Sequence, residues 1–249
     1  MHKYAKPALF LMSCLIIWNI ISNSGIVSSA LFPSPFDVLV AFIDWNSSGK
    51  LLIDVTTSLW RLIVGTIIGV ILGVIVGLAM GISRTAEETA GIFFHLTKAL
   101  PPIALIPLII LWFGIGDIGK IFLVAFAAFF PSWISALTGA KSIPVHYINT
   151  ARLFSKSNWE SYSKVILPAT MPFLINGGRI AIAIGFTMVF ASELAGASEG
   201  IGYFIAIAQI IYRPDMMIAG LIVLGLLAAT VDYFFVRAAR FAFPWVEEI

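Results

Sequence analysis

The polar side chains of this apolar sequence gather in one segment, and their types suit binding better than catalysis. This polar segment, residues 149–169, runs NTARLFSKSNWESYSKVILPA. Its charged residues are Arg152, Lys156, Glu160 and Lys164. Its apolar and aromatic residues include Ala151, Phe154, Trp159, Tyr162 and Val165. A basic, aromatic, amphipathic stretch between apolar segments is typical of a surface that inserts into a groove on a soluble partner.

Other residues that could carry chemistry lie far apart. The three histidines, His2, His95 and His146, form no HExxH motif, and the sequence contains neither GxSxG nor the phosphate loop GxxxxGK[ST]. The single cysteine, Cys14, lies in an apolar run and excludes a disulfide framework or a cysteine-based metal site. We therefore expect no catalytic site, no metal and no cofactor, and no ATP hydrolysis by this chain alone.

Composition indicates a membrane protein. The 249 residues are 60% hydrophobic and 11% charged, with a mean hydropathy of +1.00. Soluble domains are about 45–50% apolar and about 25% charged. Several uncharged runs approach the roughly 20 residues that a helix needs to cross a bilayer. We predict an all-α polytopic membrane protein with a single domain over residues 1–249.

The apolar runs predict six transmembrane helices. Their expected positions are residues 7–21, 62–82, 99–113, 121–137, 171–192 and 216–236. Residues 193–215 have an apolar centre but are too short and interrupted to count as another span. The first run also has features of a cleaved signal peptide, which leaves open whether residues 1–30 are retained.

Two local patterns predict how the helices are arranged. Ser34 can cap a helix that has Pro35 at its first position, and the apolar residues that follow favour a short helix along the membrane surface. The second span has a glycine at every fourth position. These glycines are Gly65, Gly69, Gly73, Gly77 and Gly81. Such a stripe lets another helix approach closely; lining of a substrate path is the alternative.

The basic residues predict the orientation. Six spans put both termini on one side, and membrane proteins keep most Lys and Arg on the cytoplasmic side. Eleven basic residues fall on the side of the termini and the polar segment, against four on the other. The four are Lys50, Arg61, Lys120 and Arg213. Both termini and the polar segment are therefore expected to be cytoplasmic.

The polar segment itself predicts two short helices. Pro144 can start the first, and Ser157 with Glu160 forms the S-x-x-E pattern of a capping box at the start of the second. The alternative to docking on a partner is a basic loop that lies against anionic lipid headgroups.

The spacing in the polar segment resembles the Glu-Ala-Ala signature of ABC-importer permeases: the triplet, three residues, a Gly, nine residues, then Ile-x-Leu-Pro. Here Ala151 holds the third triplet position, Val165 the Ile position, and Leu167 and Pro168 close the pattern. Four more segments match in order and spacing: LFPSP (31–35), SLWRLIVG (58–65), ALIPLIILWFGIGD (104–117) and ASELAGASEGIG (191–202). Nearly the whole chain resembles the binding-protein-dependent permeases for aliphatic sulfonates, taurine, nitrate and pyrimidine precursors.

This resemblance implies the transmembrane permease subunit of an ATP-driven ABC importer for a small polar, anionic solute. It implies a type I permease fold, a homodimer in lipid, two cytoplasmic ABC ATPase subunits and an extracytoplasmic solute-binding protein. It also implies the inner membrane of a prokaryotic cell, and no nucleic-acid partner. The alternative function is an ATP-independent secondary transporter or channel, which would predict inverted repeats and charges at the midplane.

The resemblance implies that a cytoplasmic coupling loop over residues 139–169, which contains the polar segment, contacts the ATPase. The matching coupling positions are Asn149, Ala151, Arg152, Phe154, Ser155, Trp159, Tyr162, Leu167 and Pro168. Two of them depart from the family pattern, because Asn149 replaces Glu and Ser155 replaces Gly. Ser155 disfavours a left-handed turn by about 1 kcal/mol, so we expect a continuous or shifted junction between the two helices.

Three charges inside or near the spans are candidates for translocation or gating. Arg179 and Asp232 lie in predicted spans, and Glu193 lies at the end of the fifth. Charges in such places usually face the protein interior or an aqueous path. Arg179 and Glu193 are therefore candidate path or gate residues. The alternatives are an Arg179–Asp232 structural pair near the cytoplasmic surface and a helix-end contact for Glu193.

Overall fold

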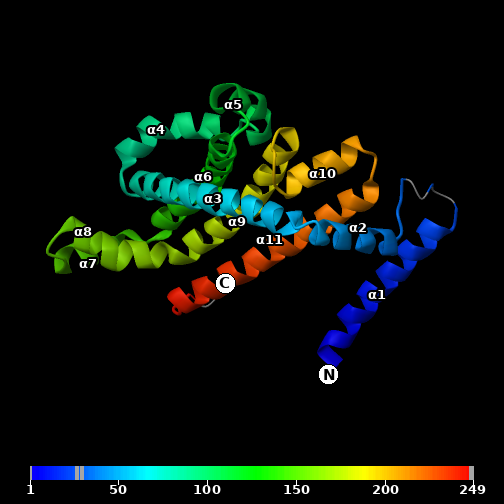
Figure 1. Ribbon diagram of the computed structural model, residues 1–249. Coiled ribbons are helices and arrows are strands. Elements are labelled where there is room, and N and C mark those ends of the chain that lie inside the picture. Colours follow the sequence, from blue (N-terminus) through cyan, green and yellow to red (C-terminus); the bar gives the residue numbers. More distant parts are fainter. Residues whose placement is uncertain (1, 26–27, 29–30, 247–249) are drawn as a thin grey trace.

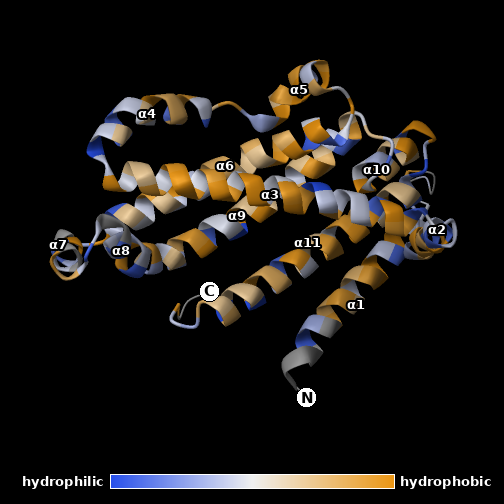
Figure 2. Cartoon of the chain, turned by 60° about the vertical axis from the view of Figure 1, so that its left-hand side comes forward, coloured by the Kyte–Doolittle hydropathy of each residue, from blue (hydrophilic) through white to orange (hydrophobic). Residues whose placement is uncertain are grey.

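The protein is described here by a computed structural model covering residues 2–25, 28 and 31–246, which contain helices and no strand. Four long helices form the body of the molecule (Figure 1). They are α3 (Lys50–Ile82), α6 (Asp117–Ser142), α9 (Leu167–Ala195) and α11 (Pro214–Ala242). All four are long and apolar enough to cross a membrane. Figure 2 shows hydrophobic residues over most of their length. The all-α class and the membrane-spanning character are thus confirmed.

Four of the six expected spans lie inside these helices. Residues 62–82 fall in α3 and residues 121–137 in α6. Residues 171–192 fall in α9 and residues 216–236 in α11. The helices extend beyond the expected bounds, most of all at the start of α3, because flanking polar and apolar residues continue the same backbone hydrogen bonding.

The stretch expected to span the membrane at residues 99–113 is not one regular helix. That stretch holds a 3₁₀ turn, η1 (Pro102–Leu105), and the short helix α5 (Ile106–Phe113). The preceding polar connection folds as α4 (Arg84–Thr97), and the two parts meet at 78°, as in a broken span or a re-entrant loop. Pro101 and Pro102 account for the break, because proline lacks an N–H and disfavours helix in the residue before it.

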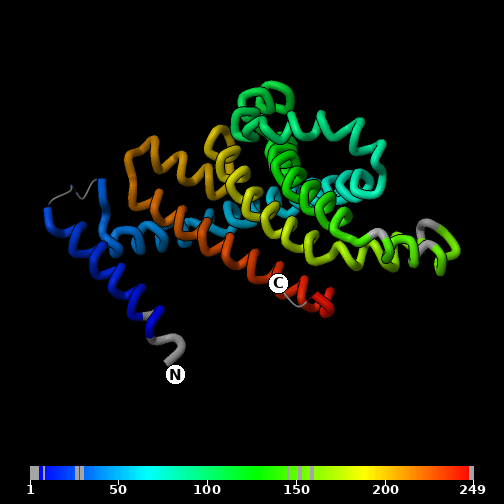
Figure 3. Tube along the Cα trace, turned by 180° about the vertical axis from the view of Figure 1, so that it is seen from behind, coloured from blue at the N-terminus to red at the C-terminus, as the bar shows by residue number. Residues whose placement is uncertain are grey.

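The first two helices attach to the body at one end. Residues 7–21 lie in α1 (His2–Asn23), which stands away from the long helices along most of its length (Figures 1 and 3). The indole of Trp18 donates to Pro33 O at 3.0 Å, so the end of α1 is tied to the start of α2 (Pro35–Ser47). Ser34 caps α2 as predicted: its Oγ accepts the Asp37 N–H at 3.2 Å, and the Asp37 carboxylate accepts the Ser34 N–H at 2.9 Å.

The glycine stripe of α3 packs directly on α6. A Cβ added at Gly65 would lie 2.6 Å from Val124 Cβ, and one added at Gly73 would lie 2.5 Å from Phe129 O. Both distances are far below van der Waals contact, so only glycine permits this approach. The packing interpretation of the stripe is confirmed.

Helix α9 completes the core on the other side of α6. Leu62 of α3, Val124 of α6 and Val189 of α9 are each at most 1% exposed and belong to one cluster. The short helix α10 (Ile201–Ile210) then packs between α9 and α11. A second cluster joins α2 to α10, where the rings of Trp45 and Phe204 stack with centroids 3.8 Å apart.

Candidate functional site

The polar segment forms a compact helical projection at one end of the molecule. After α6 the chain folds into α7 (Val145–Phe154) and α8 (Asn158–Ser161), and a π turn, η2 (Tyr162–Ile166), leads into α9. Figure 1 shows α7 and α8 at the end opposite to α2 and α10. We call these the α7–α8 end and the α2 end.

The predicted coupling residues divide into an exposed group and an anchoring group. Phe154 is 86% exposed, its neighbour Leu153 is 84% exposed, and Asn149 is also exposed. Tyr162 and Leu167 instead pack on a core cluster. This cluster is built from Leu78, Ala136 and Ala140 of α3 and α6. The side chains of Ala151, Arg152 and Trp159 lie outside the described part of the structure.

Ser155 separates the two helices without a left-handed residue. Helix α7 ends at Phe154, and Tyr212 is the only non-glycine residue with positive φ in the described chain. The junction is therefore not one continuous helix. Pro168 stands at the start of α9, directly after the π turn η2.

Glu160 fixes the start of α8. Its N–H donates to Ser157 Oγ at 3.2 Å, which is half of the predicted capping box. Its carboxylate accepts the Lys156 N–H at 2.8 Å instead of the Ser157 N–H, and it pairs with Lys164 Nζ at 2.8 Å. The hydrogen bond from Lys164, followed by that from the Lys156 backbone, lowers the pKa of the Glu160 carboxyl. The Glu160 interactions therefore stabilise this turn fully at pH values above the ordinary pKa of a carboxyl. This stabilisation is lost as the pH falls through the lowered pKa of Glu160.

Arg179 and Asp232 form a two-point ion pair between α9 and α11. Arg179 Nε and Nη2 each lie 2.7 Å from a carboxylate oxygen of Asp232. The side chains are 50% and 38% exposed. Arg179 stands 12 residues after Leu167, about 18 Å along the helix at 1.5 Å per residue. The pairing predicted as one alternative is present.

Glu193 belongs to a buried network at the α2 end. Its carboxylate is fully buried and accepts hydrogen bonds from Arg61 Nη1 at 2.6 Å, Ser58 Oγ at 2.9 Å and the Gly202 N–H at 2.9 Å. Arg61, itself 4% exposed, also pairs with Asp117 through Nη2 at 2.6 Å. One guanidinium thereby joins α3, α6 and α9.

The loop between α9 and α10 is bound to α3 by the same network. Arg61 donates to Glu199 O at 2.8 Å, and Ser58 Oγ accepts the Ile201 N–H at 2.9 Å. The carboxylate of Asp54 accepts the Gly200 N–H at 2.8 Å and the Trp45 indole N–H at 2.9 Å. Gly200 has φ of 123°, and an added Cβ would meet the Glu193 carboxylate. This loop is closed around Glu193.

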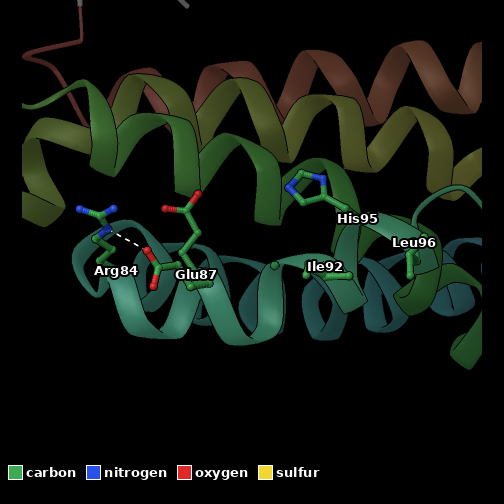
Figure 4. A pocket seen from close by; sticks show the side chains of 7 residues that line it. Arg84, Glu87, Ile92, His95 and Leu96 are labelled. Carbon is green, nitrogen blue, oxygen red and sulfur yellow. Dashed lines mark hydrogen bonds and ion pairs between the residues drawn. The ribbon is translucent and has the colours of Figure 1, made fainter.

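A shallow hollow of about 690 Å³ lies along α4 (Figure 4). Its lining includes Arg84, Glu87, Glu88 and His95. The acidic and basic groups are already paired: Arg84 Nε lies 2.8 Å from Glu88 Oε1, and Glu87 pairs with Lys141 of α6. The hollow therefore offers little uncompensated charge for an ionic ligand.

Comparison with known proteins decides the family. A model described as "Binding-protein-dependent transport system inner membrane component" matches residues 69–246. The chain belongs to this family. SsuC of Escherichia coli (strain K12), named for aliphatic sulfonates transport, is 34% identical over 226 residues, 91% of this chain and 86% of that protein. The taurine transport system permease protein TauC of the same strain is 30% identical over 240 residues, 94% of this chain and 87% of that protein.

The fold agrees with the family. A chain of the MetNI methionine ABC transporter in an inward-facing conformation superposes with a TM-score of 0.68 at 21% identity. The alignment covers 78% of this chain and 97% of that one. Family and fold together identify a permease component of an ABC importer and set aside the alternative of a secondary transporter or channel.

The buried network was missed as a unit in the sequence, although each part carried a signal. Ser58 and Arg61 lie in SLWRLIVG, Asp117 ends ALIPLIILWFGIGD, and Glu193 with Gly200 lies in ASELAGASEGIG. These are three segments that resemble the binding-protein-dependent permeases, and the structure brings them together in one place. Charged residues inside three separate matching segments were the signal.

Proposed function

We propose that this permease imports a small anionic solute of the sulfonate class, driven by ATPase subunits that dock on the α7–α8 projection. We infer the docking site from its side chains, some of which anchor the projection while others remain exposed. Tyr162 and Leu167 anchor the projection on α3 and α6, whereas Phe154 and Leu153 remain more than four-fifths exposed. An exposed aromatic on a rigidly anchored helix suits insertion into a groove, and such aromatics dominate many interfaces.

The proposed orientation places the α7–α8 end and both termini in the cytoplasm. Eleven basic residues lie on the side of the α7–α8 end and four on the other, and this asymmetry favours a cytoplasmic α7–α8 end. The α2 end then faces outward, toward an extracytoplasmic solute-binding protein, in a prokaryotic inner membrane.

The proposed solute route follows the exposed side of α9. At helical spacing that side presents Asn176, Arg179, Ala183 and Thr187. Exposing a half-exposed ion pair to lipid chains is energetically costly, so this side of α9 is expected to face water or protein. We propose that two copies of the chain pair in lipid with these sides toward a shared path, and that Arg179 binds the anionic group through Nη1, the guanidinium nitrogen that its pair with Asp232 does not use. The names of the relatives, for sulfonates and taurine, support an anion with one compact charged group.

Glu193 has a different proposed role. A fully buried carboxylate cannot meet a passing solute, so its contribution to gating is to hold the outer ends of α3, α6 and α9 together through Arg61.

The docking proposal is tested by Phe154→Ala. Truncation of one interface aromatic commonly costs about 2 kcal/mol, which is about 30-fold in affinity. We expect the variant to reach the membrane at the normal level, to lose the ATPase on purification, and to lose ATP-driven uptake of taurine or an alkanesulfonate in vesicles.

Phe241→Ala is the matched control, because Phe241 is 91% exposed near the end of α11 and lies outside the projection. It should retain the ATPase. Uptake that continues in the Phe154 variant without bound ATPase, or that never requires ATP, would overturn the proposal.

A further inference from the structure

The turn between α10 and α11 contains an unusual residue at the α2 end. The Arg213 N–H donates to Ala208 O at 2.9 Å, and the Tyr212 N–H donates to Gln209 O at 3.2 Å. These two bonds form a Schellman motif, which closes a helix with one residue in the left-handed region. That residue is Tyr212, with φ of 55°.

Tyrosine is a costly choice at this position. Glycine usually fills it because a Cβ is crowded by the neighbouring carbonyl oxygen in left-handed backbone. For a bulky residue this conformation is an outlier, and such strain concentrates at functional places. Contacts within the chain do not repay the strain, because Tyr212 is 89% exposed. The ring is therefore accessible to a partner outside this chain.

The turn is firmly held. Arg213 Nη2 lies 2.5 Å from Asp215 Oδ2, and Arg213 Nε lies 2.9 Å from Asp215 Oδ1. Asp215 stands in the first turn of α11, where a carboxylate is favoured by the helix dipole. Two further apolar residues flank Tyr212: Ile210 is 70% exposed and Ile211 is 52% exposed. A rigid turn thus presents three adjacent apolar side chains.

We propose that Tyr212, with Ile210 and Ile211, is a docking knob for the solute-binding protein. The proposal rests on the outward orientation of the α2 end proposed above, and on the family, whose transport depends on a binding protein. Tyrosine is enriched in interface hot spots, and a ring on a preformed turn loses little conformational entropy when a partner binds. The partner should offer an apolar pocket on its permease-facing surface. Anchoring of the ring in the lipid headgroup layer is the competing use.

The test is Tyr212→Gly in the assembled transporter, reconstituted in nanodiscs with its ATPase. The probe is the solute-loaded binding protein that stimulates the wild-type ATPase. The strained backbone is relieved by glycine, so the melting temperature should stay level or rise. At the same time, the binding-protein concentration that gives half-maximal stimulation should increase about 30-fold, as expected for loss of one hot-spot aromatic. ATPase activity without binding protein should not change.

Two further variants separate the explanations. Tyr212→Phe keeps the ring and should stay within a few-fold of wild type, whereas Tyr212→Asn tolerates left-handed backbone but lacks the ring and should match the glycine variant. Trp60→Ala removes another exposed aromatic, 60% exposed on α3, and should not alter docking. If the half-maximal binding-protein concentration is unchanged in Tyr212→Gly, the proposal that Tyr212 is a docking knob is wrong. A change in basal ATPase activity would also overturn the proposal, because it would indicate that the ring anchors in lipid. A wild-type transporter that no binding protein stimulates would instead refute the proposed function.

Discussion

At the scale of single residues, this chain uses ion pairs in two different settings. The Arg61–Glu193 pair is almost completely buried and satisfied by further hydrogen bonds. The Arg179–Asp232 pair is about half-exposed on the side of α9 and α11. Removing one partner from a buried pair leaves an uncompensated charge, whereas an exposed pair can be replaced by water. The first setting suits a structural joint and the second suits contact with a solute.

This contrast gives a prediction for two substitutions of the same kind. Glu193→Gln should destabilise the protein by about 3 kcal/mol, because Arg61 loses its buried counter-charge. Arg179→Gln should change stability by about 1 kcal/mol or less, because water can solvate Asp232. Uptake of an alkanesulfonate should nevertheless fall about tenfold or more in Arg179→Gln, since a charged hydrogen bond to the anion is lost.

Thermal unfolding and vesicle uptake measure the two effects. Glu88→Gln, at an exposed pair on α4, is the control and should alter neither. A severe loss of stability in Arg179→Gln would mean that the pair is enclosed by lipid or protein, and would count against the solute route.

At the scale of elements, α3 packs closely on α6. The glycines of α3 meet a matching row of small residues on α6, spaced by four. The row consists of Ala128, Ser132, Ala136 and Ala140. In a membrane the hydrophobic effect no longer drives helices together, so close van der Waals packing of such rows supplies much of the attraction.

A single methyl group should therefore disturb this contact. In Gly73→Ala the new Cβ would stand 2.5 Å from Phe129 O and 2.9 Å from Ser132 Cβ, so α3 and α6 must separate. Overpacking of this kind commonly costs about 1–3 kcal/mol, and we expect a lower melting temperature of the solubilised protein.

Gly225→Ala in α11 is the matched control, because an added Cβ there meets nothing within 4 Å. Alanine favours helix over glycine by about 0.5–1 kcal/mol, so this variant should be as stable as the wild type or more so. Equal behaviour of the two variants would show that the stripe does not determine packing.

At the scale of the whole molecule, function depends on which end faces the cytoplasm. The two ends carry different structures: the α7–α8 projection at one, and the buried network with the Tyr212 turn at the other. In the proposed function, an ATPase docks at the first end and a binding protein at the second. Both proposals therefore share one orientation.

Site-specific labelling tests that orientation. In a Cys14→Ser background, cysteines at Ser47 and Ser198 should react with a membrane-impermeant maleimide in intact cells, and a cysteine at Ser157 should not. All three positions are exposed in the structure, so access depends on the side of the membrane. Reaction at Ser157 from outside would reverse the orientation and remove both docking proposals.

The sequence by itself determined the class, the long helices and the family resemblance. These properties depend on local information: apolar runs of membrane-spanning length, a glycine every four residues, and motifs that keep their order. It also identified the polar segment, because charge is rare in this chain and conspicuous where it gathers.

Only the tertiary structure decided which distant residues meet. Pro101 and Pro102 are local signals for a break, but only the structure shows the 78° angle between α4 and the η1–α5 stretch. Ser58 and Glu193 are 135 positions apart, so no local sequence pattern indicates that they meet or that both are buried. The strain at Tyr212 was likewise invisible, because a left-handed residue is set by the hydrogen bonds that close α10 and not by its own preference.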